Sequence, residues 1–313
     1  IVATLMSTNE TIAEFLARHD SRRANAPGVA VFDCDGTVIS GDIGEAMLYT
    51  QIEEFHFRVS PATIWPDHPR NGDLHRFFVG LHNLPAEERN AHEGFQEFAE
   101  LILSWYFDQL HEGKVEKACA DIVRLLAGYT EEEIRALALR TLEQELTGPV
   151  ATRRLGRREL PRGSRYIRES LTLLRALLHH GFEVWAVSGS NSWSVERVFE
   201  RIGIPPGRVL GIELGKLGGL LVPETRSPIP VGEGKIRALR DRGTAAPALV
   251  VSDSPHDIPL FLHATELRVR VKSGDLNAAD FFRETNIARD TTWVTFDNPT
   301  LMKNEEVPWL MRQ

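Results

Sequence analysis

Hydrophobic and polar positions along the chain fall into blocks that predict short strands alternating with helices. Mainly apolar runs that end in polar or glycine residues predict buried strands at Gly28–Phe32, Phe182–Val187 and Ala248–Val251, and Leu267–Val271 and Trp293–Phe296 are expected as the last strands. Segments with apolar residues at helical spacing lie beside them, at Asn9–His19, Tyr166–His180, Ser194–Ile202 and Gly232–Arg242. Because such alternation is typical of a parallel sheet, we expect an α/β fold with a three-layer, doubly wound, mainly parallel, Rossmann-like sheet.

One antiparallel pair is expected beside this sheet. The apolar runs Val209–Leu214 and Leu217–Val222 are separated by the two residues Gly215-Lys216. Two strands joined by a two-residue turn that contains glycine predict a short hairpin.

The segment Asp42–Thr147 has helical periodicity, frequent charge and no apolar run typical of a buried strand. Glu93–Leu110 and Val115–Leu126 place apolar residues at core spacing. Thr130-Glu131-Glu132-Glu133 matches the capping box that opens a helix, and Ser60–Asp73, with three prolines, is expected as a loop. This part of the chain is therefore expected to be an all-helical insert.

The insert divides the chain into two predicted domains. Residues 1–40 and 160–313 are expected to form the α/β core, and residues 41–159 the helical insert. The stretch 148–163 is interpreted as the exit, and its arginines at 153–154 and 157–158 as solvated linker charge. Short linkers near Ser40-Gly41 and Gly148-Pro149 supply hinges for an insert that closes over a site.

Composition restricts the partners and the compartment. The 313 residues, 26% charged and 42% hydrophobic, are ordinary for a soluble globular protein. A formal net charge of −8, without a long basic stripe, argues against nucleic acid, and no apolar run is long enough to span a membrane. Two cysteines imply no disulfide framework, so we expect the cytoplasm. A cleaved signal peptide stays open as an alternative because the chain begins with Ile1, and the pattern indicates no oligomeric state.

Two aspartates directly follow the first predicted strand, in the run Asp33-Cys34-Asp35-Gly36-Thr37. In an open parallel sheet the ligand crevice lies beyond the carboxyl ends of the strands. Carboxylates this close repel each other unless a cation lies between them, and Mg²⁺ prefers oxygen ligands. Gly36 permits a sharp turn, and Thr37 offers a hydroxyl and an amide to an anion. Strand alternation should turn the Cys34 side chain away from both aspartates, as a packed small hydrophobe.

Two more predicted strands end in polar turns, and a helix between them opens with a lysine. Ser188 follows the strand Phe182–Val187, Asp253 and Asp257 follow Ala248–Val251, and Lys235 opens the helix. Because the carboxyl ends of parallel strands meet at one edge, we expect these groups to converge on the aspartates of the first strand.

The motifs DCDGT, VSGS, the lysine and SDSPHD, in this order, resemble those of the haloacid dehalogenase-type phosphatase superfamily. A helical insert directly after the first motif resembles the phosphoserine phosphatase-like subgroup, which carries a cap between motifs one and two. The resemblance covers most of the chain, excluding roughly the first two dozen residues and the C-terminal tail. It implies a Mg²⁺-dependent phosphatase that acts through an aspartyl-phosphate on a small-molecule phosphate ester.

The resemblance also implies a role for each residue of the motifs. Asp33 would be the nucleophile, and Asp35 the general acid and then the general base. Asp33, Asp253 and the backbone carbonyl of Asp35 would hold the metal, with Asp257 beside it. The transferring phosphoryl group would be bound by Ser188, Gly189 and Lys235, and Thr37 adds its hydroxyl and amide.

Two acidic residues near the start of the cap predict the leaving group. Phosphoserine phosphatases have glutamate at the position of Asp42, where it meets the substrate's amino group, and aspartate keeps the charge with a shorter reach. Glu45 lies near the cap entrance and is either a substrate contact or a solvated helix charge. Negative charge there favours an amino-bearing ester, such as a phosphoserine-like ester, phosphoethanolamine or phosphocholine. An arginine of the cap, Arg58, Arg70 or Arg76, would be needed to meet a substrate carboxylate.

Two other functions stay open. One is phosphotransfer from the aspartyl-phosphate to a second alcohol. The other is a non-catalytic, phosphate-binding interaction protein of the same fold, which the sequence disfavours because every charged group that the chemistry needs is present.

The aromatic and histidine residues of the insert receive structural interpretations. Helical spacing favours a hydrophobic core over a cage for a quaternary ammonium for most of the aromatic residues Phe55, Phe57, Trp65, Trp105, Tyr106 and Phe107. The histidines His56, His68, His75 and His82 lack metal-ligand spacing and are interpreted as surface or loop residues.

Overall fold

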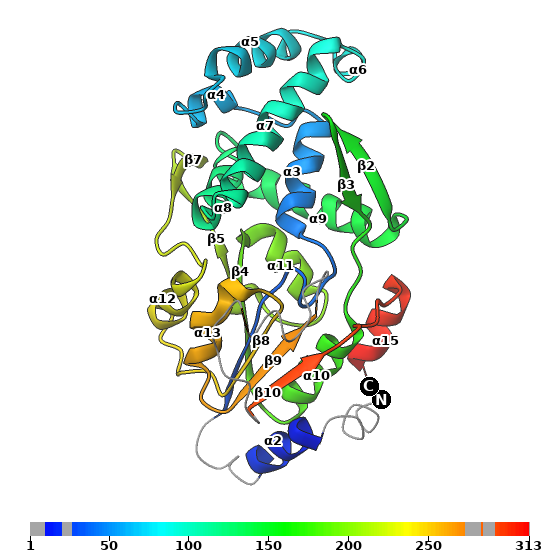
Figure 1. Cartoon of the computed structure of the whole chain (residues 1–313), viewed down its shortest axis with the longest axis vertical. Helices are drawn as coiled ribbons and strands as arrows, with labels where there is room; N and C mark the ends of the chain where they lie inside the picture. Colours follow the sequence, from blue (N-terminus) through cyan, green and yellow to red (C-terminus); the bar gives the residue numbers. More distant parts are fainter. Residues whose placement is uncertain (1–9, 21–26, 273–282, 284–291, 313) are drawn as a thin grey trace.

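The centre of the computed structural model, which describes residues 10–20, 27–272, 283 and 292–312, is a six-stranded sheet (Figure 1). Its strands are β1 (Val29–Phe32), β4 (Glu183–Asn191), β5 (Val209–Ile212), β8 (Leu249–Ser252), β9 (Leu267–Val271) and β10 (Trp293–Phe296). They lie in the order β10-β9-β8-β1-β4-β5, and every neighbouring pair is parallel. The predicted doubly wound α/β fold is confirmed.

Helices cover both faces of the sheet, because successive strand residues point to opposite sides. Ala30 and Phe32 of β1 belong to one hydrophobic cluster, together with α2 (Glu10–Asp20), α10 (Arg168–His179), α11 (Ser192–Glu200) and α15 (Val307–Arg312). Val29 and Val31 belong to another, with α12 (Glu233–Asp241) and α13 (Ile258–His263). Cys34 is buried in the first cluster, as strand alternation predicts.

Between β1 and β4 the chain builds a helical cap above the sheet (Figure 1). Its helices are α3 (Ile43–Glu53), α4 (Pro61–Ile64), α5 (Asn71–His82), α6 (Ala86–Arg89), α7 (Glu93–His111), α8 (Val115–Arg124) and α9 (Glu131–Thr147). The predicted capping box is present, since Thr130 and Glu133 exchange hydrogen bonds at the start of α9. Phe55, Phe57 and Trp65 are buried in the cap's hydrophobic cluster, as their spacing predicts. Within the described residues, the helices are too short or too polar to cross a bilayer.

The exit of the cap is a β-hairpin, which the sequence analysis does not predict. β2 (Ala151–Leu155) pairs with β3 (Arg158–Arg162) in antiparallel register. Arg153 points inward, where it forms ion pairs with Glu145 and with Glu53, the latter at 3.0 Å. The interpretation of Arg153 as solvated linker charge is therefore wrong, because the alternation of a strand turns it into the protein while Arg154 stays exposed.

The turn of a second hairpin lies three residues later in the chain than predicted. β6 (Leu214–Leu217) and β7 (Leu220–Thr225) are joined by Gly218-Gly219, whose φ values are 59° and 85°. A tight hairpin turn with positive φ at both central residues favours two glycines, which explains why Gly215-Lys216 lies within a strand instead. Val209–Ile212 joins the main sheet as β5, so its prediction as a hairpin strand is wrong.

This hairpin connects the core to the cap. The Gly128 amide donates to the Leu221 carbonyl at 2.8 Å, and the Leu221 amide donates to the Tyr129 carbonyl at 2.7 Å. Lys216 of β6 also pairs with Glu131 at the start of α9. The cap is therefore attached to the core through the hairpin as well as through its two chain connections.

Two expectations for the first half of the cap need correction. His68 is buried rather than at the surface, since its ring lies 5.1 Å from that of Trp105 and contacts the Leu101 carbonyl at 3.2 Å. Burial lowers the pKa of His68, which favours the neutral ring. The stretch Ser60–Asp73 is not entirely loop, because it contains α4 and the start of α5.

Candidate active site

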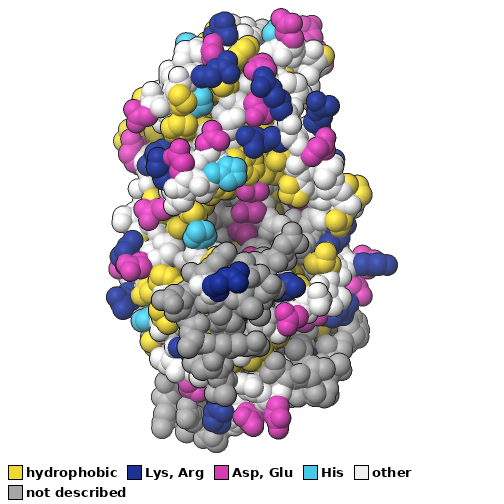
Figure 2. Space-filling model, in the orientation of Figure 1, with side chains coloured by type: hydrophobic (Ala, Val, Ile, Leu, Met, Phe, Trp, Pro, Cys, Tyr) yellow, Lys and Arg dark blue, Asp and Glu magenta, His cyan; other side chains and the backbone are white. Residues whose placement is uncertain are grey.

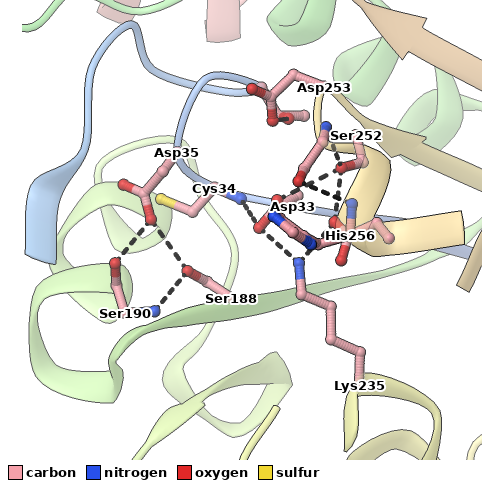
Figure 3. Close-up of polar contacts among 12 residues, drawn as sticks. Asp33, Cys34, Asp35, Ser188, Ser190, Lys235, Ser252, Asp253 and His256 are labelled. Atoms are coloured by element: carbon pink, nitrogen blue, oxygen red, sulfur yellow. Dashed lines mark hydrogen bonds and ion pairs between the residues drawn. The ribbon is translucent and has the colours of Figure 1, made fainter. Parts of the chain in front are cut away.

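Three neighbouring strands bring the predicted site residues to one edge of the sheet. β1 lies between β4 and β8, so Asp33, Ser188 and Asp253 lie side by side at the carboxyl ends (Figure 3). They line a pocket of about 480 Å³ between this edge and the cap. Figure 2 shows the hollow with acidic side chains inside it. Residues that line the same pocket are Asp35, Asp42, Glu45, Gly189, Lys235 and Asp257.

Asp33 is held in a buried network at the base of the pocket. Its Oδ1 accepts a hydrogen bond from the Cys34 amide at 2.8 Å and lies 3.0 Å from the ammonium of Lys235. The same ammonium lies 2.7 Å from Asp257 Oδ2. The Ser252 hydroxyl donates to Asp257 at 2.6 Å and lies 3.4 Å from Asp33 Oδ2. Asp33 is thus fixed from several sides, with a cation beside one oxygen.

Burial and neighbouring charges together set the pKa values of Asp33 and Lys235. Burial raises the pKa of Asp33 well above its usual value, Lys235 lowers it, and Asp257, Asp253 and Asp35 raise it further. Burial alone would lower the pKa of Lys235, but its two carboxylate partners outweigh burial and raise it. The lysine is therefore charged, and one lysine does not balance the carboxylates around it.

Asp35 lies beside Asp33 and turns toward β4. Its Oδ1 accepts the Ile43 amide at 2.7 Å, and its Oδ2 accepts the hydroxyls of Ser190 at 2.7 Å and Ser188 at 3.1 Å (Figure 3). Burial is the largest influence on the pKa of Asp35, followed by the charge of Asp42, and together they raise it to about 7 despite the three hydrogen bonds. A carboxyl group with this pKa can give or take a proton near neutrality.

Asp253 and Gly36 meet at the turn that follows β1. A Cβ on Gly36, whose φ is +65°, would lie 2.2 Å from Asp253 Oδ2, so only glycine leaves room for this carboxylate. The Thr37 hydroxyl donates to Asp253 Oδ1 at 3.0 Å, and Thr37 is fully buried outside the pocket lining. Its hydroxyl is directed at Asp253 rather than into the pocket, which differs from the expectation that this hydroxyl contacts phosphate.

The oxygen donors beyond β1 and β8 fit a hard cation. Asp33 and Asp253 supply carboxylates, Asp35 lines the same pocket, and Gly36 leaves room for the Asp253 carboxylate. Among the described residues, no three His, Cys, Asp or Glu side chains are grouped to hold a metal ion. The expected Mg²⁺ ligands are two carboxylates and a backbone carbonyl, so they do not form a group of three such side chains.

Asp42 and Glu45 form the acidic side of the pocket near the cap. Asp42 caps α3, because its Oδ1 accepts the Glu45 amide at 2.8 Å. Burial and the neighbouring charge of Glu45 raise its pKa to about 7. Glu45 accepts the hydroxyls of Tyr49 at 2.7 Å and Tyr106 at 3.0 Å, and burial raises its pKa. The interpretation of Glu45 as a solvated helix charge is therefore wrong.

Comparison with known families identifies the hydrolase class. The model of the haloacid dehalogenase-like hydrolase family matches residues 30–262, which include every motif described above. The chain belongs to this family. A search of curated proteins finds no match to the sequence.

Solved structures share the fold of this haloacid dehalogenase-like hydrolase. A protein of unknown function from Anaerococcus prevotii superposes with a TM-score of 0.70 and 19% identity, over 91% of this chain and 90% of that chain. A protein of unknown function from Bordetella pertussis gives 0.53 and 14%, over 87% and 99%. A substrate-bound phosphoserine phosphatase gives 0.45 and 14%, over 91% and 99%. At such identities the likeness concerns the fold alone.

Two serines of the hydrolase site, Ser190 and Ser252, are not among the residues predicted from the sequence. Ser190 donates to Asp35, and it lies two residues beyond Ser188, so the period of a strand could have placed both on one side. Ser252 links Asp257 to Asp33 from the last position of β8. The signal for Ser252 in the sequence is its position directly before Asp253, because a serine there is small but can donate a hydrogen bond.

Proposed function

We propose that this hydrolase cleaves small, amino-bearing phosphate monoesters with Mg²⁺, through an aspartyl-phosphate on Asp33. The observation that carries the proposal is the pairing of two unlike carboxyl groups in one pocket. Asp33 lies against the Lys235 ammonium at 3.0 Å, whereas Asp35 is held by the neutral hydroxyls of Ser188 and Ser190, with no lysine or arginine within ion-pair distance among the described residues. Such a difference separates a nucleophile from a proton carrier.

The first half-reaction transfers the phosphoryl group to the protein. The Asp33 carboxylate attacks phosphorus, the bond from phosphorus to the alcohol oxygen breaks, and Asp35 gives its proton to that oxygen. Ser188, the Gly189 backbone and Lys235 line the pocket beside Asp33, and they would bind the phosphoryl oxygens. The alcohol then leaves with its oxygen as a neutral hydroxyl group.

The second half-reaction restores the carboxylate. Water attacks the phosphorus of the aspartyl-phosphate, Asp35 takes the proton from water, and the bond to Asp33 breaks to release phosphate. Asp33, Asp253 and the Asp35 carbonyl would hold Mg²⁺, which would offset the charge of the phosphoryl oxygens. Among the described residues, the four carboxyl groups here face Lys235 and, near Asp253, the buried Arg270, and this excess of negative charge supports the need for a further cation.

The pocket and its charge support a small substrate with a cationic nitrogen. The cap covers the carboxyl edge of the sheet, so the pocket excludes macromolecular esters (Figure 1). Asp42 and Glu45 line the pocket, and buried carboxylates are costly unless paired with a cation.

The test is a panel of phosphomonoesters assayed with and without Mg²⁺. We expect turnover of amino-bearing esters that is lost after exhaustive chelation. Asp33→Asn should abolish turnover and the phosphorylated protein, because an amide cannot attack phosphorus. Asp67→Asn, which changes an exposed aspartate of the cap, is the matched control and should behave as the wild type. Near wild-type activity of Asp33→Asn would refute the covalent mechanism.

A further inference from the structure

We propose that Glu45, held by the hydroxyls of Tyr49 and Tyr106, binds the cationic nitrogen of the leaving group, and that the substrate is the phosphate ester of an amino alcohol without a carboxylate. This inference rests on the proposed phosphatase function, because it assigns the leaving-group half of the same pocket. It names the recognising residue and excludes the amino acid ester from the three substrates considered.

The contacts around Asp35 give the direction of the leaving group. A general acid must lie at the alcohol oxygen that it protonates, so the alcohol starts at Asp35. Ser190 donates to Asp35 at 2.7 Å and lies 3.5 Å from Asp42 Oδ1, and Asp42 in turn accepts the Glu45 amide. An alcohol that extends away from the phosphoryl site along these residues reaches the Glu45 side of the pocket.

The Glu45 carboxylate is preorganised without a protein cation. The Tyr49 hydroxyl binds its Oε2 and the Tyr106 hydroxyl binds its Oε1, and both tyrosines are buried. Within the described residues, no lysine, arginine or histidine lies within ion-pair distance of Glu45. Two neutral donors fix the position of a carboxylate but do not neutralise its charge, so a cation from the substrate would complete the site.

Asp42 is less suited to this role. Its Oδ1 already accepts the Glu45 amide as the cap of α3, so this carboxylate stabilises the helix that carries Glu45. Aspartate is also shorter than the glutamate expected at its position. Asp42 therefore adds negative charge to the pocket, while Glu45 presents the fixed oxygens to the leaving group.

Among the described residues, the cap side of the pocket offers no cationic partner to a substrate carboxylate. Its other lining residues from the cap are neutral: Tyr106, Val115, Cys119 and Ile122. The three candidate arginines lie outside the lining, with Arg58 paired to Glu133 at 2.6 Å and both Arg70 and Arg76 paired to Asp73 at 2.8 Å. The carboxylate of a phosphoserine-like substrate would face Asp42 and Glu45 without a cation. The apolar lining instead suits a short carbon chain or N-methyl groups.

The experiment compares kcat/KM for four esters of similar size. O-Phosphoethanolamine and phosphocholine carry a cationic nitrogen, 2-hydroxyethyl phosphate replaces the ammonium by a hydroxyl, and O-phosphoserine adds a carboxylate. We expect the two cationic esters to exceed 2-hydroxyethyl phosphate by about 100-fold and O-phosphoserine by at least about 10-fold. The ethanolamine and choline arms distinguish a primary ammonium from a quaternary one.

Glu45→Gln tests the residue, because glutamine keeps the shape and still accepts a tyrosine hydroxyl. In Glu45→Gln we expect kcat/KM for the cationic esters to fall about 100-fold more than kcat/KM for 2-hydroxyethyl phosphate. A higher KM should account for this difference. Tyr106→Phe should give a smaller loss of the same kind. Glu87→Gln, on the exposed α6 of the cap, is the matched control, and thermal unfolding checks that each variant folds.

The possible results separate the two proposals. A protein that hydrolyses none of the esters refutes the phosphatase function itself. Hydrolysis of all four at similar rates, or an equal loss on cationic and neutral esters in Glu45→Gln, overturns the inference and leaves the phosphatase function standing. A preference for O-phosphoserine overturns the assignment to an amino alcohol.

Discussion

The Lys235 ammonium lies 2.7 Å from Asp257 Oδ2, and both residues are buried in the wall of the pocket. The substitution Lys235→Met removes the cation and leaves the carboxylates of Asp257 and Asp33 without a compensating charge. We expect Lys235→Met to lower the free energy of unfolding by about 3–5 kcal/mol at pH 7. Urea unfolding measures the change.

A second variant distinguishes lost charge balance from lost packing. Asp257→Asn added to Lys235→Met removes one of the two uncompensated carboxylates, so the double variant should be more stable than Lys235→Met alone. A double variant that is less stable by the sum of the two single changes would contradict the account of Lys235 as a bridging cation.

Asp42 should make the metal-free protein less stable as the pH rises. Its pKa is about 7 in the folded protein and near 3.8 in the unfolded chain, so the folded protein binds the proton more tightly between these values. This stabilisation is present below about pH 4 and is lost as the pH rises through 7, at up to about 1.4 kcal/mol per pH unit. Asp42→Asn, which can still cap α3, should flatten that part of the stability curve.

The measurement is chemical unfolding at several pH values in the presence of a chelator. Asp67→Asn, at an exposed position of the cap, is the control and should keep the wild-type slope. An Asp42→Asn protein with the full wild-type loss of stability between pH 4 and 7 would show that Asp42 is not protonated in this range.

Ser190 should set the pKa of Asp35. Its 2.7 Å hydrogen bond favours the charged carboxylate and so lowers the pKa. Without this bond, Ser190→Ala should move the corresponding limb of the kcat profile to higher pH and reduce kcat by about 10-fold. Ser104→Ala removes a comparable serine–carboxylate bond, to Glu100 at 2.9 Å outside the pocket, and should leave the profile in place. An unmoved limb in Ser190→Ala would exclude this role.

Gly36→Ala should displace Asp253 and weaken Mg²⁺ binding. The added Cβ would lie 2.2 Å from Asp253 Oδ2, at a residue whose φ of +65° already disfavours alanine. We expect a rise of at least about 10-fold in the Mg²⁺ concentration for half-maximal activity, together with a loss of about 1–2 kcal/mol in stability. Gly72→Ala on α5 is the control, since its Cβ meets open space and should stabilise by about 0.5–1 kcal/mol. Unchanged Mg²⁺ dependence in Gly36→Ala would remove Asp253 from the metal site.

The sheet and the strand-end residues could be predicted from sequence because their signals are local. An apolar run such as Val29–Phe32 predicts a strand that is buried on both faces, without information on its neighbours. The carboxyl ends of parallel strands lie at one edge of the sheet. Asp33, Ser188 and Asp253 therefore converge without any knowledge of the loops. The capping box at Thr130 is equally local, and it is present where the sequence places it.

The features that the sequence did not predict depend on distant neighbours. The burial of Glu45 requires Tyr106, which lies 61 positions away, and nothing in the periodicity of α3 indicates that partner. Arg153 belongs to a short, charged strand whose inward face is visible only once Glu145 is placed beside it. The sequence predicts the hairpin turn at Gly215-Lys216 rather than at Gly218-Gly219, because both pairs are two-residue segments that contain glycine.

The β6–β7 hairpin changes how the pocket can exchange its contents. Rotation about the two predicted hinges would carry Tyr129 away from Leu221, and so would break the hydrogen bonds of 2.7 and 2.8 Å between cap and hairpin. The cap and the hairpin must therefore move together, or the cap as a whole stays in place while substrate and product pass. In the second case the width of the entrance is fixed, so larger esters are excluded before they contact the charged residues of the pocket.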